Sequence, residues 1–374
     1  MKRLFLILLS VIVFLLSVEF LLRFVFGFCN AMLYTSSDAY EYIAAPNQNR
    51  YRLGAHIHIN SYSQRCEEPD STKVRVLGLG DSVLFGGTMT DQEDLASSIF
   101  SEETGIQMLN ISAGSWGPDN CAAYLREKGV FGAKAVVLVC SSHDAYDRMS
   151  HVPVVGLYPN YPDKQYRWAI GELIDRYVIP KISFYWKKTK QQLDPDETVV
   201  KLVENATVQP KSSMEYPVNE GFDELKEIAD SVGIPLFVYL HAERGEVMCG
   251  EYNVMGKAII EWMEKNKIPC LKGIDAGESV EMYRDGIHLN EKGQRHFRDS
   301  HVIIVDRLIS RRSAVRIHMM CHLAGMDLRH GHGFFLMGML PLFSEPRFQM
   351  VIKRHCTSPF PVRKPARTVK ISFR

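Results

Sequence analysis

The feature that most constrains the fold of this chain is a regular alternation of short apolar runs and amphipathic segments between residues 73 and 310. The apolar runs have the length of buried strands and are bounded by glycine, proline or polar residues. Strands that alternate with helices form a parallel sheet with helices on both faces. The predicted strands are 74–80, 106–112, 133–144, 234–243 and 268–275, and the predicted helices are 91–105, 117–130, 220–233, 255–267 and 290–310.

One internal segment breaks this alternation. Residues 150–215 are irregular and carry Tyr158, Tyr161, Tyr166 and Trp168. We interpret the segment as an insertion that serves as a lid or a substrate platform. Its aromatic rings would suit stacking on sugars, although ordinary loop packing is the alternative.

The C-terminal part, residues 311–374, is basic and aperiodic. It holds 12 of the 44 basic residues but only 2 of the 43 acidic ones, so the rest of the chain is acidic overall. An acidic body gives no support to nucleic-acid binding. The eight cysteines form no Cys-x-x-Cys pair, so we expect neither a metal site nor a cofactor.

The N-terminus predicts a membrane helix. Residues 1–28 begin with Lys2 and Arg3 and are then almost wholly apolar, over the roughly 20 residues that cross a bilayer. A cleaved signal peptide is the alternative, but no small-x-small site follows the run. An uncleaved anchor would leave Lys2 and Arg3 in the cytoplasm and place the body outside it, in the periplasm or the extracellular space. Residues 29–72 then look like a polar connector.

The first predicted strand ends in Gly80-Asp81-Ser82, and more glycine follows. Open parallel sheets keep their reactive groups at the carboxyl ends of strands. Ser82 is therefore a candidate nucleophile, but a serine hydroxyl is weak unless a base takes its proton. The rest of the chain must supply that base, an orienting acid and donors for an oxyanion.

The best candidate base is His288, which lies three residues after Asp285 and just before the last predicted helix. This spacing lets the Asp285 carboxylate hold the imidazole in one tautomer while the other ring nitrogen faces the serine. An Asp-x-x-His pair by itself is more often an ordinary surface turn. The catalytic interpretation of the pair is favoured only if further polar groups lie at the same edge of the sheet.

Such groups follow the next two predicted strands. The turn after the second strand contains Gly114 and Ser115, and the third strand leads into a polar cluster that contains His143. Parallel strands place these turns at one edge with Ser82. The backbone N–H groups of Ser82 and of Gly114 or Ser115 could then form an oxyanion hole, to which His143 could add a side-chain N–H.

In this order the motifs resemble those of the SGNH (GDSL-like) hydrolase superfamily. The four blocks look like Gly80-Asp81-Ser82, the turn after Asn110, Ser141-Ser142-His143-Asp144 and Asp285-Gly286-Ile287-His288, so the resemblance covers about residues 72–310. It implies a three-layer α/β/α, flavodoxin-like fold and the cleavage or transfer of acyl groups on esters without a metal. By position, Ser82 would be the nucleophile, His288 the base and Asp285 its orienting partner.

The third block departs from the family pattern. The family typically has Gly-x-Asn-Asp there, with the asparagine donating to the oxyanion, whereas this chain has His143 at the asparagine position. A neutral imidazole can also donate one N–H, so its tautomer becomes decisive. In the second block the family's glycine could align with Gly114 or with Ser115.

The His-Asp form of the third block and the N-terminal anchor are similar to exported family members linked to cell-surface polysaccharides. The preamble Ile59, Asn60, Ser61 and Arg65 adds to this likeness. Those members remove or add O-acetyl groups on sugars. The resemblance therefore implies a membrane-anchored serine esterase or acyltransferase that acts on acylated carbohydrate. Two alternatives stay open: a catalytically silent carbohydrate-binding module on the same fold, and a lipase or thioesterase with an apolar cleft.

Overall fold

The centre of the molecule is a five-stranded parallel sheet. The computed structural model describes residues 2–183, 186 and 217–300. The strands lie in the order β6 (Gln107–Ser112), β5 (Arg75–Gly80), β7 (Val136–Ser141), β8 (Leu236–His241) and β9 (Cys270–Lys272). Counted from β5, this is the 2-1-3-4-5 order of flavodoxin-like folds, which bind ligands where the strand order reverses. Here that switch point lies between β5 and β7.

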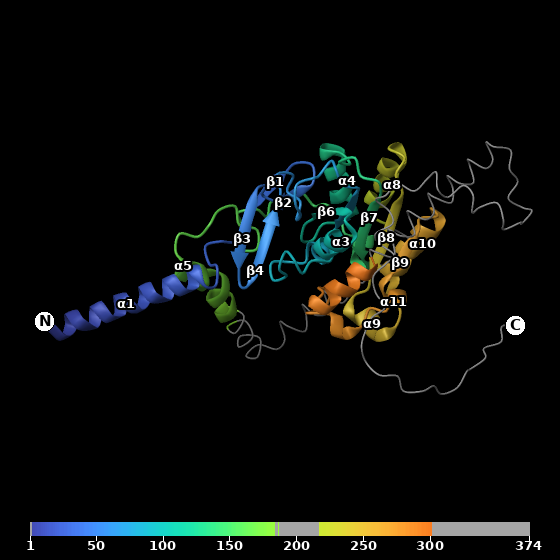
Figure 1. The fold of residues 1–374 in the computed structure, drawn as a ribbon. Coiled ribbons are helices and arrows are strands. Elements are labelled where there is room, and N and C mark those ends of the chain that lie inside the picture. Colours follow the sequence, from blue (N-terminus) through green and yellow to red (C-terminus); the bar gives the residue numbers. More distant parts are fainter. Residues whose placement is uncertain (1, 184–185, 187–216, 301–374) are drawn as a thin grey trace, which may run out of the picture. The chain divides into compact units, whose positions relative to one another are not determined.

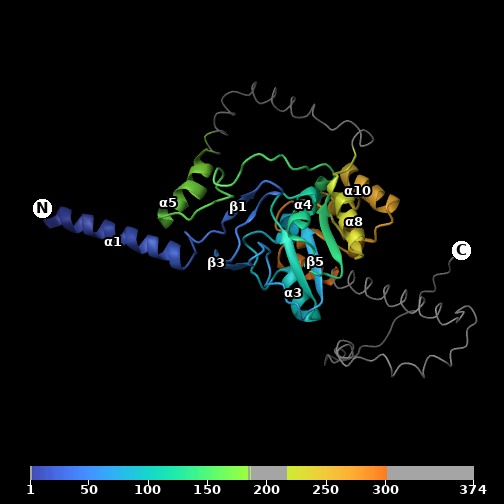
Figure 2. The same ribbon diagram turned by 90° about the horizontal axis from the view of Figure 1, so that it is seen from above.

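Helices cover both faces of the sheet (Figures 1 and 2). Successive side chains of a strand point to opposite faces, so Leu138 of β7 packs in one core cluster and its neighbours Val137 and Val139 in another. One cluster takes in α4 (Pro118–Lys128), α8 (Gly221–Ser231) and α10 (Val254–Lys265), and the other takes in α3 (Ala96–Thr104) and the helical residues 291–300. The predicted three-layer, flavodoxin-like fold is confirmed.

All five predicted strands and the long predicted helices are present, with shorter bounds. The last predicted helix is seen over residues 291–300, and its remainder lies outside the described residues. Several short segments are absent from the sequence prediction, because three to six residues carry too little periodicity. They are the helices α2 (Ser82–Phe85), α9 (Arg244–Cys249) and α11 (Gly273–Ala276) and the 3₁₀ segments η1 (Ser142–Ala145) and η3 (Val280–Met282).

Residues 29–72 are not the polar connector that the sequence suggests. They form two antiparallel hairpins, β1 (Tyr34–Ser37) with β2 (Glu41–Ala44) and β3 (Gln48–Arg52) with β4 (Ala55–Ile59). The interpretation fails because several buried side chains of this segment are polar and therefore resemble surface residues in a sequence. They include Gln48, Arg52, Asn60, Gln64 and Arg65.

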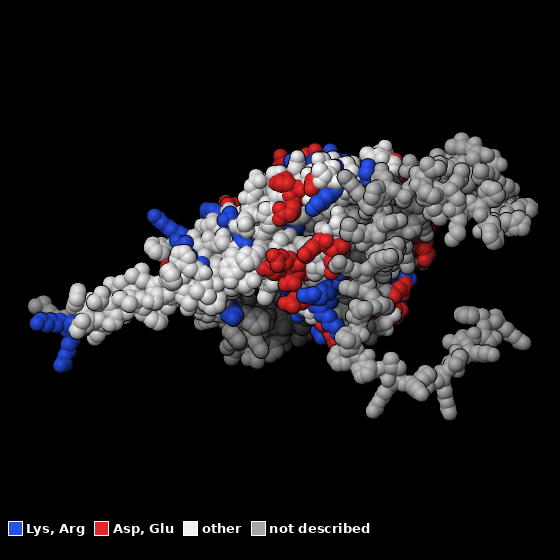
Figure 3. All heavy atoms as spheres, viewed as in Figure 1, with Lys and Arg blue, Asp and Glu red and all other residues white. Residues whose placement is uncertain are grey.

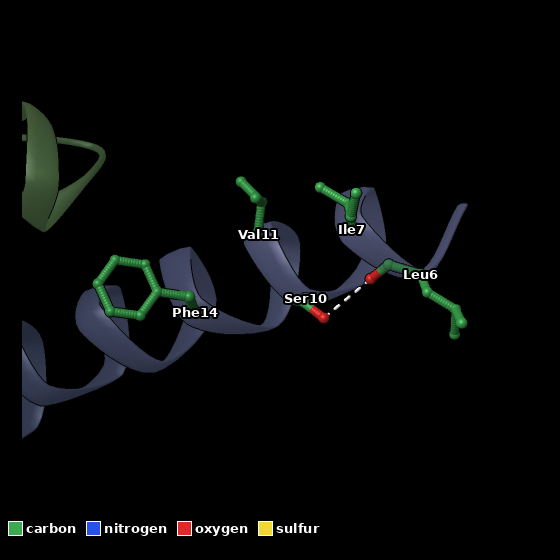
Figure 4. Close-up of a pocket in the computed structure, with 5 residues that line it drawn as sticks. All are labelled: Leu6, Ile7, Ser10, Val11 and Phe14. Carbon is green, nitrogen blue, oxygen red and sulfur yellow. Dashed lines mark hydrogen bonds between the residues drawn. The ribbon is translucent and has the colours of Figure 1, made fainter. Parts of the chain in front are cut away.

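The N-terminal segment forms one helix, α1 (Lys2–Phe24), which buries no side chain within the protein. It is long and apolar enough to cross a membrane. A signal sequence near the N-terminus would meet the same criteria of length and composition. In Figure 3 it is a rod free of charged atoms between its basic N-terminal end and the body. Figure 4 shows a shallow groove on its surface, lined by Leu6, Ile7, Ser10, Val11 and Phe14.

The chain divides into two compact units, Met1–Ala314 and Val315–Arg374. The second unit, with most of the predicted basic extension, lies outside the described residues. Of the predicted insertion 150–215, the structure describes residues 150–183 and 186. The described portion contains α5 (Ala169–Leu173) and a π-helical turn, η2 (Ile174–Val178).

Candidate active site

Ser82 is the first residue of α2, directly beyond the end of β5. Asp81 caps this short helix, because its side chain accepts a hydrogen bond from the backbone N–H of Val83 at 2.8 Å. Gly80 allows β5 and β7 to approach closely, since a Cβ there would lie 2.8 Å from the carbonyl oxygen of Val139. Gly80 thus allows the close strand contact and Asp81 caps the helix that follows. Together they place Ser82 at the switch point.

The loop beyond Ser82 is held by a buried arginine, Arg65. Its guanidinium donates to the carbonyl oxygens of Phe85 at 2.5 Å, of Thr90 at 2.7 Å and of Gly87. The guanidinium carbon also lies 4.9 Å from the centre of the Phe85 ring. Burial lowers the pKa of Arg65 to about 9, so the side chain stays charged at neutral pH and fixes the loop that carries the nucleophile.

Ser82, His288 and Asp285 are brought together by the fold. His288 Nε2 lies 3.0 Å from Ser82 Oγ, and His288 Nδ1 lies 2.8 Å from Asp285 Oδ2. With the proton on Nδ1, that nitrogen donates to Asp285 and Nε2 accepts from the Ser82 hydroxyl. The three predicted residues therefore have the geometry of a Ser-His-Asp triad, and their catalytic role is taken up below as a proposal.

Asp285 is held and kept charged by its own turn. Its Oδ1 accepts the backbone N–H groups of Ile287 at 3.0 Å and of His288 at 2.8 Å. Partial burial opposes ionisation, but these hydrogen bonds and the His288 side chain outweigh it and lower the pKa of Asp285 to about 2. The carboxylate is ionised at neutral pH and favours the tautomer with the proton on Nδ1.

A buried histidine at the end of β8 anchors the same turn. His241 Nε2 lies 2.8 Å from the carbonyl oxygen of Ile287, and its Nδ1 lies 2.8 Å from a carboxylate oxygen of Glu278. Burial would lower the pKa of His241, but the charge and hydrogen bond of Glu278 raise it overall. In its protonated form His241 donates from both nitrogens and fastens the residue next to His288 to the sheet.

The predicted oxyanion turn follows β6. Ser115 adopts the left-handed conformation with φ 58, and the Gly114 carbonyl accepts the Tyr42 hydroxyl at 2.7 Å. A Cβ on Gly114 would meet nothing within 4 Å, so space is open beside it. Within the described ranges the N–H groups of Gly114 and Ser82 have no hydrogen-bond partner. Both are therefore free to donate to a bound group.

His143 stands on η1, just beyond β7, among three carboxylates. Its Nδ1 lies 3.4 Å from Glu243, and its Nε2 lies 3.6 Å from Asp144 and 3.7 Å from Asp81. Burial alone would lower the pKa of His143, but the bond to Glu243 and the surrounding negative charge raise it to about 9. At neutral pH the ring is a cation, so both nitrogens carry protons and the tautomer no longer decides whether it can donate.

The two buried aspartates beside His143 form a tight acidic pair. Burial raises the pKa of both carboxyl groups, and the charge of Asp81 raises that of Asp144 further. Asp144 Oδ2 accepts the Ser141 N–H at 2.6 Å, while its buried Oδ1 has no hydrogen-bond partner in the described structure. Together with His143 they offer three atoms within 4.8 Å that could ligate a metal ion. The chemistry proposed below uses the His143 cation instead.

No protein-family model and no curated protein matches the chain. Among solved structures, the chain is similar to a lipolytic protein of the G-D-S-L family from Veillonella parvula, with 11% identity, a TM-score of 0.36, and coverage of 63% of this chain and 100% of that one. It is also similar to a two-domain esterase active on acetylated mannans, with 10% identity, a TM-score of 0.37, and coverage of 63% and 50%.

A third similar structure is the esterase EstA from a Pseudoalteromonas species, with 13% identity, a TM-score of 0.35, and coverage of 63% of this chain and 98% of that one. Many solved structures similar to this chain are thus described as GDSL-type lipolytic proteins or esterases. The chemistry proposed below rests on the geometry of the site, because likenesses this distant carry no functional weight.

Of the four aromatic residues noted in the insertion, Tyr161 belongs to the packing of the molecule. Its ring centre lies 5.2 Å from that of Tyr34 and 4.8 Å from that of Tyr42. Tyr158 and Trp168 are exposed, and the Tyr166 hydroxyl bonds to Asp175. Ordinary packing explains Tyr161, and the stacking of sugars on the other rings stays a prediction.

Three residues that support the site are absent from the sequence prediction: Glu243, His241 and Tyr42. A fourth, Arg65, appears there only in the preamble that resembles exported family members. Each acts on a group far away in the chain, so no local spacing marks it. One signal was available, since Glu243 and His241 stand at the end of the fourth predicted strand, where a parallel sheet gathers its functional groups.

Proposed function

We propose that this chain is a serine esterase or acyltransferase in which Ser82 is the nucleophile, His288 the base and Asp285 the orienting acid. One observation carries the proposal: two linked contacts of 3.0 and 2.8 Å run from Ser82 through His288 to Asp285 at the switch point of the sheet. A structural histidine would not need a free ring nitrogen directed at a serine hydroxyl at the end of a strand.

In the first half of the reaction, Ser82 Oγ attacks the ester carbonyl carbon and its proton passes to His288 Nε2. The carbonyl oxygen becomes an oxyanion, and the Asp285 carboxylate stabilises the imidazolium. The C–O bond to the alcohol then breaks, and His288 returns the proton to the leaving oxygen. The acyl group stays on Ser82.

In the second half, water or a sugar hydroxyl attacks the acyl carbon and gives its proton to His288. Collapse of this second oxyanion frees Ser82, which regains the proton. We propose that both oxyanions are stabilised by the N–H groups of Ser82 and Gly114 and by the His143 cation, with Ser115 shaping the turn. Donors placed where charge develops are worth about 10²–10³-fold in rate each.

For the substrate class we propose acylated carbohydrate, with acetyl esters first. The support is the His143-Asp144 form of the third block together with the N-terminal helix, which resemble exported polysaccharide-modifying members of the family. We further propose that α1 remains as an anchor and that the body lies outside the cytoplasm, because Lys2 and Arg3 precede the apolar run.

Hydrolysis of p-nitrophenyl acetate by the full chain in detergent tests the proposed reaction. We expect turnover that Ser82→Ala and His288→Ala abolish, while the exposed controls Ser36→Ala and His151→Asn retain it. If the folded chain shows no turnover beyond that of Ser82→Ala, the esterase proposal fails and a carbohydrate-binding module on this fold takes its place. A strong preference for long acyl chains would instead favour a lipase or thioesterase.

A further inference from the structure

The described end of the insertion carries an exposed apolar stripe. After α5 the chain continues through η2 and stays helical to residue 183. Along it Ile174, Val178, Ile182 and Trp186 recur every fourth residue and are all exposed, Trp186 to 72%. Residues four apart lie on one face of a helix. A soluble surface rarely leaves such a row uncovered.

The opposite face of the same helix is fastened to the body. Glu172 is fully buried and pairs with Arg52 at 2.8 Å and with Arg176 at 3.1 Å. The Tyr177 hydroxyl accepts a bond from Arg52 at 3.0 Å, and its ring packs 5.7 Å from that of Phe28. Because the inner face is fixed by these contacts, the apolar stripe is held outward.

The N-terminus of α5 is joined directly to the end of α1. The two carboxylate oxygens of Glu19 accept the backbone N–H groups of Ala169 at 2.8 Å and Ile170 at 2.9 Å. Arg23 pairs with Glu19 at 2.9 Å and donates to the carbonyl of Arg167 at 2.8 Å. A charged residue late in the apolar run thus caps a second helix. Figure 1 shows α5 beside the end of α1. The exposed stripe therefore begins where the candidate span ends.

We propose that the helix over residues 169–183 lies in the interfacial layer of the lipid bilayer that α1 crosses, with its apolar stripe toward the acyl chains. The proposal rests on α1 remaining as the membrane anchor. Helices with one apolar and one polar face lie in this layer, and tryptophan prefers it. Trp168 and Trp186 are both exposed, and so is Phe26 at the end of α1. Since Glu172 ties the helix to Arg52, binding to lipid would fix how the body stands on the membrane.

The four tryptophans of the chain make a direct test feasible. Trp168 and Trp186 are exposed, while Trp116 and Trp262 are buried in the body. The full chain is reconstituted into phosphatidylcholine vesicles whose acyl chains carry bromine, which quenches tryptophan emission at close range. We expect strong quenching, which the double variant W168F/W186F loses and the control Trp262→Phe keeps.

Three outcomes would overturn the proposal. A chain that does not float with vesicles would remove the anchor. Exposed tryptophans that aqueous acrylamide quenches and brominated lipid does not would lie in water. Emission that resists both quenchers would mean that protein covers the stripe. Ile182→Glu should reduce the quenching, whereas its neighbour Lys181→Glu should not. Ester turnover is measured on the same samples. A failure of the helix to bind lipid and a failure of the proposed reaction then give different results.

Discussion

At the scale of single residues, His143 is the position where this chain departs most from the pattern it resembles. An asparagine there would donate from a neutral amide at any pH. A histidine among Asp81, Asp144 and Glu243 is a cation that can donate only while it keeps its protons. If His143 serves the oxyanion as proposed, this exchange makes the stabilisation of the oxyanion depend on pH.

This gives a prediction about the alkaline side of the pH–rate profile. The pKa of His143 is raised from its ordinary value of 6.5 to about 9, so the ring is almost fully protonated at neutral pH and loses its proton as pH rises through about 9. We expect kcat to fall with a midpoint near pH 9. His143→Asn should remove this fall, and Glu243→Gln should move it to lower pH. An unchanged alkaline limb in His143→Asn would show that His143 does not serve the oxyanion.

The juxtaposition of the three proposed triad residues could be predicted from the sequence because each of them has a local signature. Ser82 follows the glycine that ends a predicted strand. Asp285 and His288 are three residues apart, and the turn between them brings their side chains within hydrogen-bond distance. The position of Glu243 at the end of a predicted strand was visible, but its contact with His143 could not be predicted, because that contact depends on how β7 and β8 are aligned. Motifs within one turn are visible in a sequence, while partners on neighbouring strands are not.

At the scale of elements, the parallel sheet was predictable because its strands are buried on both faces and read as continuous apolar runs. The two hairpins of residues 34–59 were not, because strands of four or five residues with buried polar side chains give no clear alternation. These hairpins matter to the site, since Tyr42 of β2 holds the Gly114 carbonyl. Arg65, which follows them, holds the loop after Ser82.

Arg65 supports a prediction about stability. Arg65→Met would leave three carbonyl oxygens near Phe85 without their donor, and each such loss costs about 1–3 kcal/mol. We expect the thermal unfolding midpoint of the full chain in detergent to drop by many degrees. Arg126→Met, which removes a mostly exposed pair with Glu224, should change stability by about 1 kcal/mol or less. Equal midpoints for the two variants would contradict the role given to Arg65.

At the scale of the whole molecule, the described residues combine a candidate membrane helix, a layer of hairpins and an α/β/α domain with the triad at its switch point. The sequence indicated the first and last of these, since long apolar runs and regular alternation are strong signals. It gave no sign that Glu19 caps α5, because a carboxylate inside an apolar run looks only like an interruption. The roles of the polar groups that join these parts can be recognised only in the folded structure, where their partners are visible.

The central claim is that Ser82 is an activated nucleophile, and its most direct test is covalent labelling. The full chain in detergent is treated with a fluorophosphonate, which forms a phosphonyl ester only with an activated serine, and the labelled peptide is identified by mass spectrometry. We predict one adduct on Ser82 that is absent in His288→Ala, although that variant keeps the serine. A folded chain with no adduct, or with the adduct on another serine, would contradict the claim.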